Sequence, residues 1–464
     1  MSHRDVLQRA ANLAVGYLDG IAERPVGPPV AVDRLRAALG GPLPEKGEDP
    51  RVVVESLASG VEAGLVASCG PRYFGFVIGG ALPATVAADW LTSAWDQNAW
   101  TYAASPAGSV AEEVAAGWLV ELLGLPAGTS VGFTTGATMA SFTALAAARS
   151  AVLRRVGIDV EEEGLAGAPP VAVIVGDAVH ATVLAALQML GLGRGRVRRV
   201  ATDDQGRMDA EALRDVLAIC HGPTIVCAQA GEVNTGASDP LAEIGKLTRE
   251  HGAWLHIDGA FGLWAAASPK LRHLVTGVEQ ADSWSTDGHK WLNVPYDSGF
   301  VFFRSREALR QAMSLDAAYY AMSEKGERDN FLCVPESSRR ARGFTVWAAL
   351  RSLGRAGVRE MIERCCSMAQ RMAARLCDDP GVELLNDIVL NQVLVRFLSR
   401  GGDNADAFTR EVIRRIQADG TCWLGGTRWR GRAAARISIS NWSTAEADID
   451  RSADAILRCL RELR

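Results

Sequence analysis

The lysine of the segment STDGHKW, residues 285–291, is the first candidate for chemistry. Only five of the chain's 49 basic residues are lysines: Lys46, Lys246, Lys270, Lys290 and Lys325. Lys290 follows His289 directly, at the polar end of an expected strand where Gly288 permits a tight turn. A lysine amine in such a place can attack a carbonyl carbon, although an ordinary surface lysine would look similar.

A carboxylate precedes this lysine by 32 residues. Asp258, in the segment HIDGA of residues 256–260, falls at the carboxyl end of another expected strand. Open α/β sheets bind ligands outside the carboxyl ends of their strands. A lysine and an aspartate on two such ends suit pyridoxal phosphate, because the amine forms a Schiff base and the carboxylate pairs with the pyridinium nitrogen. The alternative for Asp258 is a capping carboxylate in a turn.

Two further segments could complete a cofactor site. VGFTTGAT, residues 131–138, has the pattern of a strand, a turn at Gly136 and the start of a helix. The amides of Ala137 and Thr138 would then face a phosphate at the helix N-terminus. His180 follows an expected strand directly and could stack on a flat pyridine ring, or be a turn histidine. Each signal is weak alone, but their joint occurrence at strand ends indicates pyridoxal phosphate.

The surrounding pattern predicts the elements that would position these residues. Short β-rich runs at 170–177, 223–231 and 253–260, followed by SWSTDGHK and SGFVFFR, alternate with helical segments. Such alternation predicts an α/β fold with a mostly parallel sheet covered on both faces. After residue 345 long helical patterns and two further strand candidates predict a separate α+β part.

We therefore expect three parts: a helical arm at 1–70, a large α/β domain at 71–345 and a small α+β domain at 346–464. The arm holds too few apolar residues for a core of its own. At 464 residues the chain exceeds the usual size of one core.

Composition excludes several classes of protein. Forty-eight per cent of the residues are hydrophobic and the net charge is −5, which argues against a disordered chain and against a nucleic-acid or membrane-surface partner. No transmembrane segment or signal peptide is expected. The nine cysteines form no CxxC pair and no metal-ligand spacing, so we expect reduced thiols, no metal and a cytoplasmic protein.

From about residue 60 to residue 445 the chain resembles the group II pyridoxal-phosphate-dependent amino-acid decarboxylases. The resemblance is carried by AASPAGSVAEEVAAGWL, HIDGAFG, DGHKWLNVPYDSG and SRRARGFTVWAALRSLG. It implies fold type I, the aminotransferase-like architecture with a seven-stranded type of sheet. It also implies a homodimer with active sites at the subunit interface, where Trp100 and Tyr102 would contact the partner.

The resemblance also implies roles for single residues. Lys290 matches the Schiff-base lysine, and Tyr319, with Tyr320 as its neighbour, matches the loop tyrosine that protonates the substrate carbon after CO2 leaves. The remaining matches all bind the cofactor: His289 beside the lysine, Asp258 on the pyridinium, Ala260 under the ring, His180 stacked on it, Ala137 and Thr138 on the phosphate, and Asp287 where family members often place an Asn.

We expect decarboxylation of an L-amino acid to its amine and CO2, with an aromatic amino acid as the leading substrate. Acidic substrates such as glutamate, aspartate or cysteine sulfinate stay open. So do an aminotransferase, a decarboxylating aldehyde synthase and an inactive cofactor-binding protein. Glu232 and the glycines Gly75, Gly79 and Gly80 depart from the sequence of aromatic decarboxylases and leave the substrate undecided.

The loop tyrosine gives a direct test. Tyr319→Phe removes the proposed proton donor and keeps the ring, so amine formation should fall and oxygen should divert the reaction toward aldehyde and ammonia. Product analysis under air measures this, with Tyr320→Phe as the control. Full amine production by both variants would show that the proton comes from elsewhere.

Overall fold

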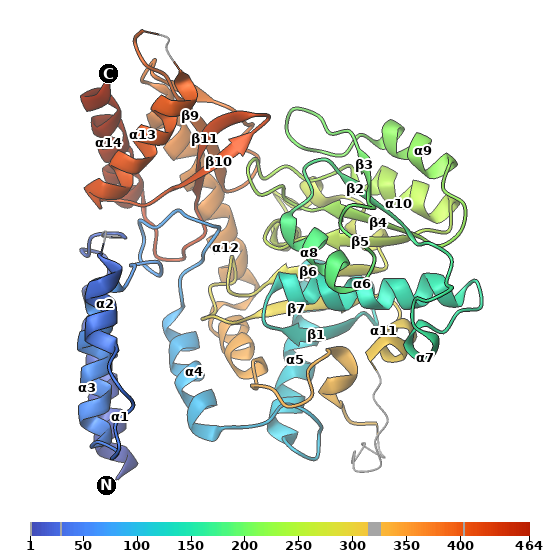
Figure 1. Ribbon diagram of the computed structural model, residues 1–464, viewed down its shortest axis with the longest axis horizontal. Helices are drawn as coiled ribbons and strands as arrows, with labels where there is room; N and C mark the ends of the chain where they lie inside the picture. Colours follow the sequence, from blue (N-terminus) through green and yellow to red (C-terminus); the bar gives the residue numbers. More distant parts are fainter. Residues whose placement is uncertain (1, 28–29, 314–325, 402–403) are drawn as a thin grey trace. The chain divides into compact units, whose positions relative to one another are not determined.

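The computed structural model describes residues 2–27, 30–313, 326–401 and 404–464. The chain forms two compact units (Figure 1). The smaller unit consists of Met1–Ile78, Gln370–Leu385 and Val393–Arg464, and the larger of Gly79–Ala369 and Asn386–Gln392. The helical arm expected at 1–70 thus falls in the same unit as most of the C-terminal segment.

A seven-stranded sheet forms the centre of the larger unit, in the order β1-β7-β6-β5-β4-β2-β3. Strands β2 to β6 run parallel, whereas β7 is antiparallel to both β1 and β6. The expected mostly parallel α/β sheet is therefore confirmed. The strands are β1 Ser130–Thr134, β2 Ala172–Gly176, β3 Arg198–Val200, β4 Thr224–Gln229, β5 Trp254–Asp258, β6 Ser283–Asp287 and β7 Gly299–Phe303.

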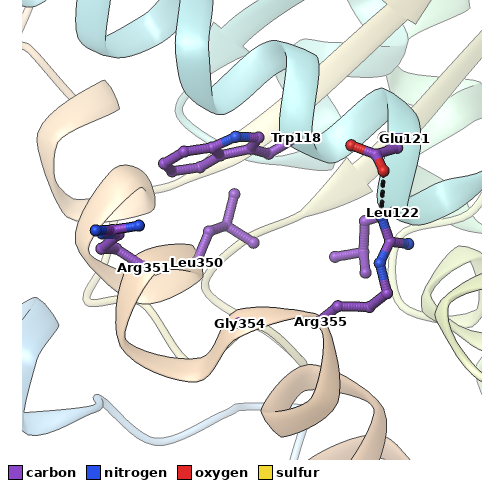
Figure 2. Close-up of a pocket in the computed structure, with 7 residues that line it drawn as sticks. All are labelled: Trp118, Glu121, Leu122, Leu350, Arg351, Gly354 and Arg355. Carbon is purple, nitrogen blue, oxygen red and sulfur yellow. Dashed lines mark hydrogen bonds and ion pairs between the residues drawn. The ribbon is translucent and has the colours of Figure 1, made fainter.

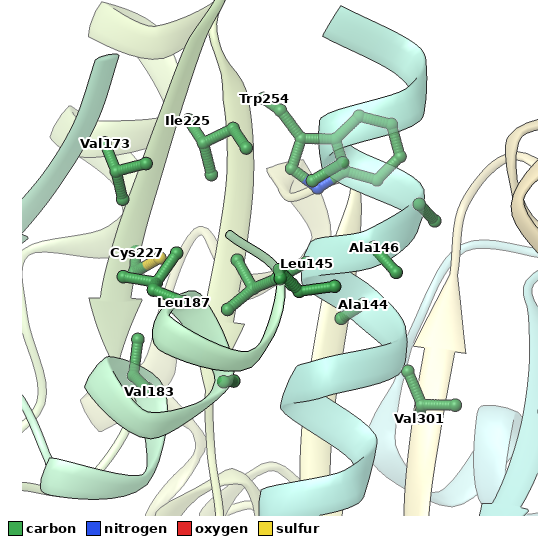
Figure 3. Packing of buried hydrophobic residues seen from close by; sticks show 14 of the residues in the cluster. Ala144, Leu145, Ala146, Val173, Val183, Leu187, Ile225, Cys227, Trp254 and Val301 are labelled. Carbon is green, nitrogen blue, oxygen red and sulfur yellow. The ribbon is translucent and has the colours of Figure 1, made fainter. Parts of the chain in front are cut away.

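Both faces of this sheet are buried. On one face, strand side chains such as Ile225 and Val301 pack against α6, Ala137–Arg154, and α8, Ala181–Met189 (Figure 3). The small side chains of α6, including Ala144, let this helix approach the strands closely. On the other face Val226, like its neighbours, has no solvent exposure, so the strands read as continuous apolar runs.

The helices of the larger unit begin and end with local signals. Both α4, Pro83–Trp95, and α5, Pro106–Leu123, carry a proline in the first turn, where a missing N–H costs no hydrogen bond. Ser105 caps α5 by accepting from the Gly108 amide, and Gly124 ends it in the left-handed region. The other helices here are α7 Val160–Glu163, α9 Ala210–Ala218, α10 Leu241–Glu250 and α11 Arg306–Met313.

The long helix α12, Gly343–Cys377, is interrupted at Gly354, whose φ of 60° and ψ of 179° are not helical. A pocket of about 270 Å³ lies between this interruption and α5 (Figure 2). Trp118 forms one wall, and Arg355 closes one end through an ion pair with Glu121 at 2.6 Å. None of the residues expected to bind the cofactor lines this pocket.

The smaller unit contains a four-stranded sheet in the order β10-β11-β9-β8. Trp423 stacks on Tyr73 with ring centroids 5.1 Å apart, and a side chain at Gly75 would collide with the Trp423 ring. The elements are α1 His3–Asp19, α2 Val32–Leu39, α3 Pro50–Val61, β8 Val382–Leu384, β9 Gln392–Phe397, α13 Ala405–Asp419, β10 Gly425–Trp429, β11 Arg432–Ser438 and α14 Glu446–Leu463. Across the described residues no helix is both long and apolar enough to cross a bilayer.

Candidate active site

The expected chemical residues follow the carboxyl ends of neighbouring strands. Asp258 is the last residue of β5, and Asp287 is the last residue of the adjacent strand β6. The Asp287 amide donates to the Ala260 carbonyl at 3.0 Å, so the two strand ends are joined just beyond the sheet. His180 follows β2, which lies two strands from β5 in the sheet.

Lys290 forms an ion pair with Asp287, with 2.9 Å between Nζ and Oδ2. The lysine side chain is 20% exposed, whereas the carboxylate is almost completely buried at 3%. Burial strengthens such a pair, because little water competes for either charge. The ion pair thus holds the amine of Lys290 just beyond the carboxyl end of β6, at the edge of the sheet where ligands bind in open α/β folds.

Asp287 also reaches the helix that follows β1. Its Oδ1 accepts a hydrogen bond from the Ala137 amide at 2.6 Å, so it caps the N-terminus of α6. Gly136 precedes this helix, and a side chain there would lie 3.0 Å from Cε1 of His289 and 3.2 Å from Oδ1 of Asp287. Only a glycine leaves the space in front of these groups open.

His289 has a fixed tautomer when neutral. The Ser298 amide donates to Nδ1 at 3.2 Å, so the ring proton lies on Nε2, which is 3.3 Å from Oδ1 of Asp287. Burial lowers the pKa of His289, with the Asp287 charge opposing this effect. Tyr296 stacks on the imidazole with ring centroids 4.3 Å apart. The protonated nitrogen of the neutral imidazole therefore lies next to the Asp287 carboxylate and adds no positive charge there.

His180 is oriented by its own helix. It caps α8, because its Nδ1 accepts from the Thr182 amide at 3.3 Å and lies 2.7 Å from the Thr182 hydroxyl. These contacts place the proton of the neutral ring on Nε2. The turn-histidine interpretation and the cofactor-stacking interpretation are compatible, since the cap fixes the ring plane while Nε2 stays unused by the cap.

Asp258 is surrounded on the sheet side by neutral groups. The residue is 6% exposed, and its Oδ1 accepts from the Ala260 amide at 3.1 Å. Burial and the Asp258 charge raise the pKa of Cys227 to about 12, and burial lowers the pKa of His256 to about 4. Neither Cys227 nor His256 therefore supplies a cation to Asp258, whose carboxylate can pair with one arriving from the strand ends.

These residues fit pyridoxal phosphate. The N-terminus of α6 with the open space at Gly136 suits a phosphate, Lys290 supplies an amine, and Asp258 supplies a buried carboxylate one strand away. The Asp287 side chain carries no N–H donor, unlike that of an Asn; it accepts from the Ala137 amide and pairs with the Lys290 amine.

Two departures from aromatic decarboxylases have structural explanations. Glu232 is 2% exposed, and its carboxylate accepts from the amides of Asn234 and Thr235 at 2.7 and 2.8 Å, within its own turn. Burial raises its pKa and these hydrogen bonds oppose the shift. A side chain at Gly79 would lie 1.8 Å from the Lys290 carbonyl oxygen, so close packing requires this glycine.

Other expected residues are only partly placed. Tyr319 and Tyr320 lie outside the described residues. The Tyr102 amide donates to Asp329 at 2.9 Å, and the Trp100 carbonyl accepts from the Phe331 amide at 3.1 Å, so both backbones are tied to the same chain. Thr138 lies exposed in the first turn of α6.

Sequence reasoning missed two residues that hold the segment around Lys290. Arg342 pairs with Asp297 through two contacts of 2.7 and 3.2 Å, and Asn293 binds the backbone of Gly80. Both Asn293 and Asp297 stand in the quoted segment DGHKWLNVPYDSG, but nothing in that segment reveals their partners, which are 213 and 45 residues away.

The model of the pyridoxal-dependent decarboxylase conserved domain matches residues 33–398. The chain belongs to this family. The aromatic-L-amino-acid decarboxylase of Bacillus atrophaeus is 29% identical over 454 residues, covering 96% of this chain and 92% of that protein. The 4-hydroxyphenylacetaldehyde synthase of Rhodiola rosea is 26% identical over 451 residues, covering 94% and 90%.

Among solved structures, Oryza sativa TDC with PLP and tryptamine superimposes with a TM-score of 0.92 at 26% identity, covering 99% of this chain and 97% of that one. The fold expected from the resemblance is therefore confirmed for this decarboxylase, and so is pyridoxal phosphate as its cofactor.

Two buried groups of this decarboxylase should give opposite pH dependences of stability. Burial lowers the pKa of His256 in the folded state to about 4 from its usual 6.5, so the folded state binds fewer protons and stability falls as the pH falls from about 6.5 to 4. The folded pKa of Asp239 is about 6 against 3.8, so stability rises as the pH falls from about 6 to 4. Each effect amounts to about 3 kcal/mol over its whole window.

Thermal unfolding of His256→Gln and Asp239→Asn between pH 6.5 and 4.5 measures these effects. Relative to wild type, His256→Gln should gain stability as the pH falls and Asp239→Asn should lose it. Parallel slopes for the two variants would contradict the assignment.

Proposed function

We propose that this chain removes the α-carboxylate of an aromatic L-amino acid as CO2 and releases the amine. The observation that carries the proposal is the placement of Lys290 and Asp258 after neighbouring strand ends, beside the N-terminus of α6. The overall reaction consumes one proton, because the carboxylate leaves without its electron pair and the carbon that held it must be protonated.

Each described residue has a task in this proposal. Bound pyridoxal phosphate supplies an electron sink for the pair left by the departing carboxylate. Lys290 would hold the cofactor through its amine, and Asp287, 2.9 Å from that amine, would keep it at the end of β6 whenever it is not bound to the cofactor. Asp258 keeps the proton on the ring nitrogen, since a carboxylate beside that nitrogen favours its charged form.

Two histidines orient the reacting groups. The Thr182 contacts of His180 fix its ring plane, so that His180 would stack on the bound cofactor, and the neutral ring of His289 lies beside Asp287 with Nε2 3.3 Å from Oδ1. The N-terminus of α6, where the Ala137 amide already donates to Asp287, would face the phosphate at Ala137 and Thr138, and Ala260 would support the ring. Tyr319 supplies the proton to the substrate carbon, a role that rests on the sequence alone.

The preference for an uncharged aromatic side chain rests on two observations. The relative from Bacillus atrophaeus carries the name of an aromatic-L-amino-acid decarboxylase. In addition, the buried arginines Arg339 and Arg342 are already ion-paired with Glu112 and Asp297, each at 2.7 Å. An acidic substrate would need a cation that is not already neutralised in this way.

The test combines product analysis with labelling. Protein loaded with pyridoxal phosphate should release equimolar CO2 and amine from an aromatic amino acid, and borohydride should fix the cofactor to the peptide containing Lys290. Asp258→Ala should fold but lose about 10³-fold in turnover, because a neutral pyridine is a poorer electron sink. Label on Lys246, Lys270 or Lys325, or release of aldehyde with ammonia, would contradict the proposal.

We also propose that the active form is a homodimer in the cytoplasm. A groove of about 800 Å³ on the larger unit is lined by apolar side chains of α4, α5 and α12, including Leu91, Trp95 and Val110, which are 48%, 50% and 48% exposed. Helices α1, α2 and α3 contain no fully buried residue. Apolar surface on this scale favours a second copy of the chain as the partner that covers it.

The proposed compartment rests on the cysteines. All nine are free thiols, which suits a reducing compartment.

Substitution in the groove tests the dimer. Val110→Glu would place a charge in the proposed interface, so sedimentation should show a monomer or a dissociation constant raised by at least about 10²-fold. Ile219→Glu, at an apolar position that is 64% exposed and lies outside the groove, is the matched control and should stay dimeric. A wild-type protein that is monomeric and active would refute the proposal.

A further inference from the structure

The turn that carries Lys290 is held by the side chain of Asn293. The backbone N–H of Asn293 also donates to the Lys290 carbonyl at 3.3 Å, and this bond closes the turn after the lysine. Asn293 has no solvent exposure and a φ of 56°, in the left-handed region that asparagine tolerates better than most other residues. The residue is thus committed to this turn by its backbone as well as by its burial.

Both ends of the Asn293 side chain are engaged. Oδ1 accepts from the Gly80 amide at 2.6 Å, and Nδ2 donates to the Trp291 carbonyl at 2.9 Å and to the Met361 sulfur at 3.6 Å. The Asn293 carbonyl accepts from the Leu82 amide at 3.0 Å. One residue therefore binds the lysine turn, the start of α4 and a side chain of α12.

Gly79 brings a second backbone into contact with the same turn. A Cβ at Gly79 would lie 1.8 Å from the carbonyl oxygen and 2.9 Å from the carbonyl carbon of Lys290, and 3.3 Å from Cγ of Asn293. The obstacle is main chain, which cannot rotate away as a flexible side chain could. Gly79 and Gly80 come directly after the YFGFVI stretch in the sequence.

We propose that Asn293 and Gly79 are positioning residues that lock the Lys290 backbone to residues 79–82. The lock fixes the point from which the four-carbon side chain of Lys290 reaches the cofactor. Any movement of residues 79–82 would therefore also move the backbone of Lys290. The inference rests on the proposed role of Lys290 as the cofactor lysine.

The expected consequence is a loss in turnover rather than in substrate binding. A displacement of about 1 Å at a reacting group can cost about 10²-fold in rate. Asn293→Ala removes the side-chain contacts to Gly80 and Trp291, and Gly79→Ala pushes on the Lys290 carbonyl from the other side. Each variant should lower kcat by about 10²-fold, change KM by less than about threefold, and alter the visible absorption band of the lysine-linked cofactor.

Gly277→Ala is the matched control. A Cβ at Gly277 would lie 2.3 Å from backbone atoms of Ala242, and the φ of 92° at Gly277 adds strain. Gly277 directly precedes η4, Val278–Gln280, and Ala242 lies on α10, so this clash does not involve the lysine turn. This variant should lose stability and keep the wild-type band and kcat. The double variant Asn293→Ala/Gly79→Ala should be clearly less than additive, because both changes break the same contact.

The outcomes are separable. Borohydride labelling of a lysine other than Lys290 in the wild type would overturn the proposed function itself. Correct labelling, with Asn293→Ala and Gly79→Ala behaving like Gly277→Ala, would overturn the positioning role. If Asn293→Ala does not fold, Asn293→Asp keeps an acceptor for the Gly80 amide but loses the donor to Trp291, and it should still alter the band and kcat. An unaltered band and kcat in Asn293→Asp would likewise overturn the role.

Discussion

The hydrogen bond from the Ala137 amide to Asp287 joins the two structural parts of the site. It connects the N-terminus of α6, which follows the edge strand β1, to the end of β6, which lies two strands away in the sheet. The same carboxylate holds Lys290 at 2.9 Å. The position of the amine therefore depends, through Asp287, on a helix start that is 150 residues from that aspartate in the sequence.

Parallel strand direction makes this arrangement possible. Because β2, β4, β5 and β6 run the same way, their carboxyl ends lie at one edge, and the turns beyond them can place His180, Asp258 and Lys290 at that edge. The apolar packing of α6 and α8 on the sheet supplies the rigidity that the polar ends lack. The site is thus a polar rim on a rigid apolar support.

Neutral groups beneath the rim preserve its charge pattern. Burial keeps the His256 imidazole uncharged, so that it does not pair with Asp258, and keeps the Cys227 thiol protonated, so that it adds no repelling charge. Glu232 is the opposite case, since a buried carboxylate is accommodated by the amides of its own turn and takes no part in the pattern. Its unusual identity therefore gives no information about the substrate.

The sequence by itself determined the alternation of strands and helices, and with it the fold, because apolar runs and turn residues are local signals. It also placed Lys290, Asp258, His180 and Ala137 at element ends, where parallel topology brings such residues to one edge. Only the tertiary structure decided the partners of Asp287, Asn293 and Gly79, because these contacts join segments 150, 213 and 211 residues apart, and no local pattern encodes a distant backbone atom.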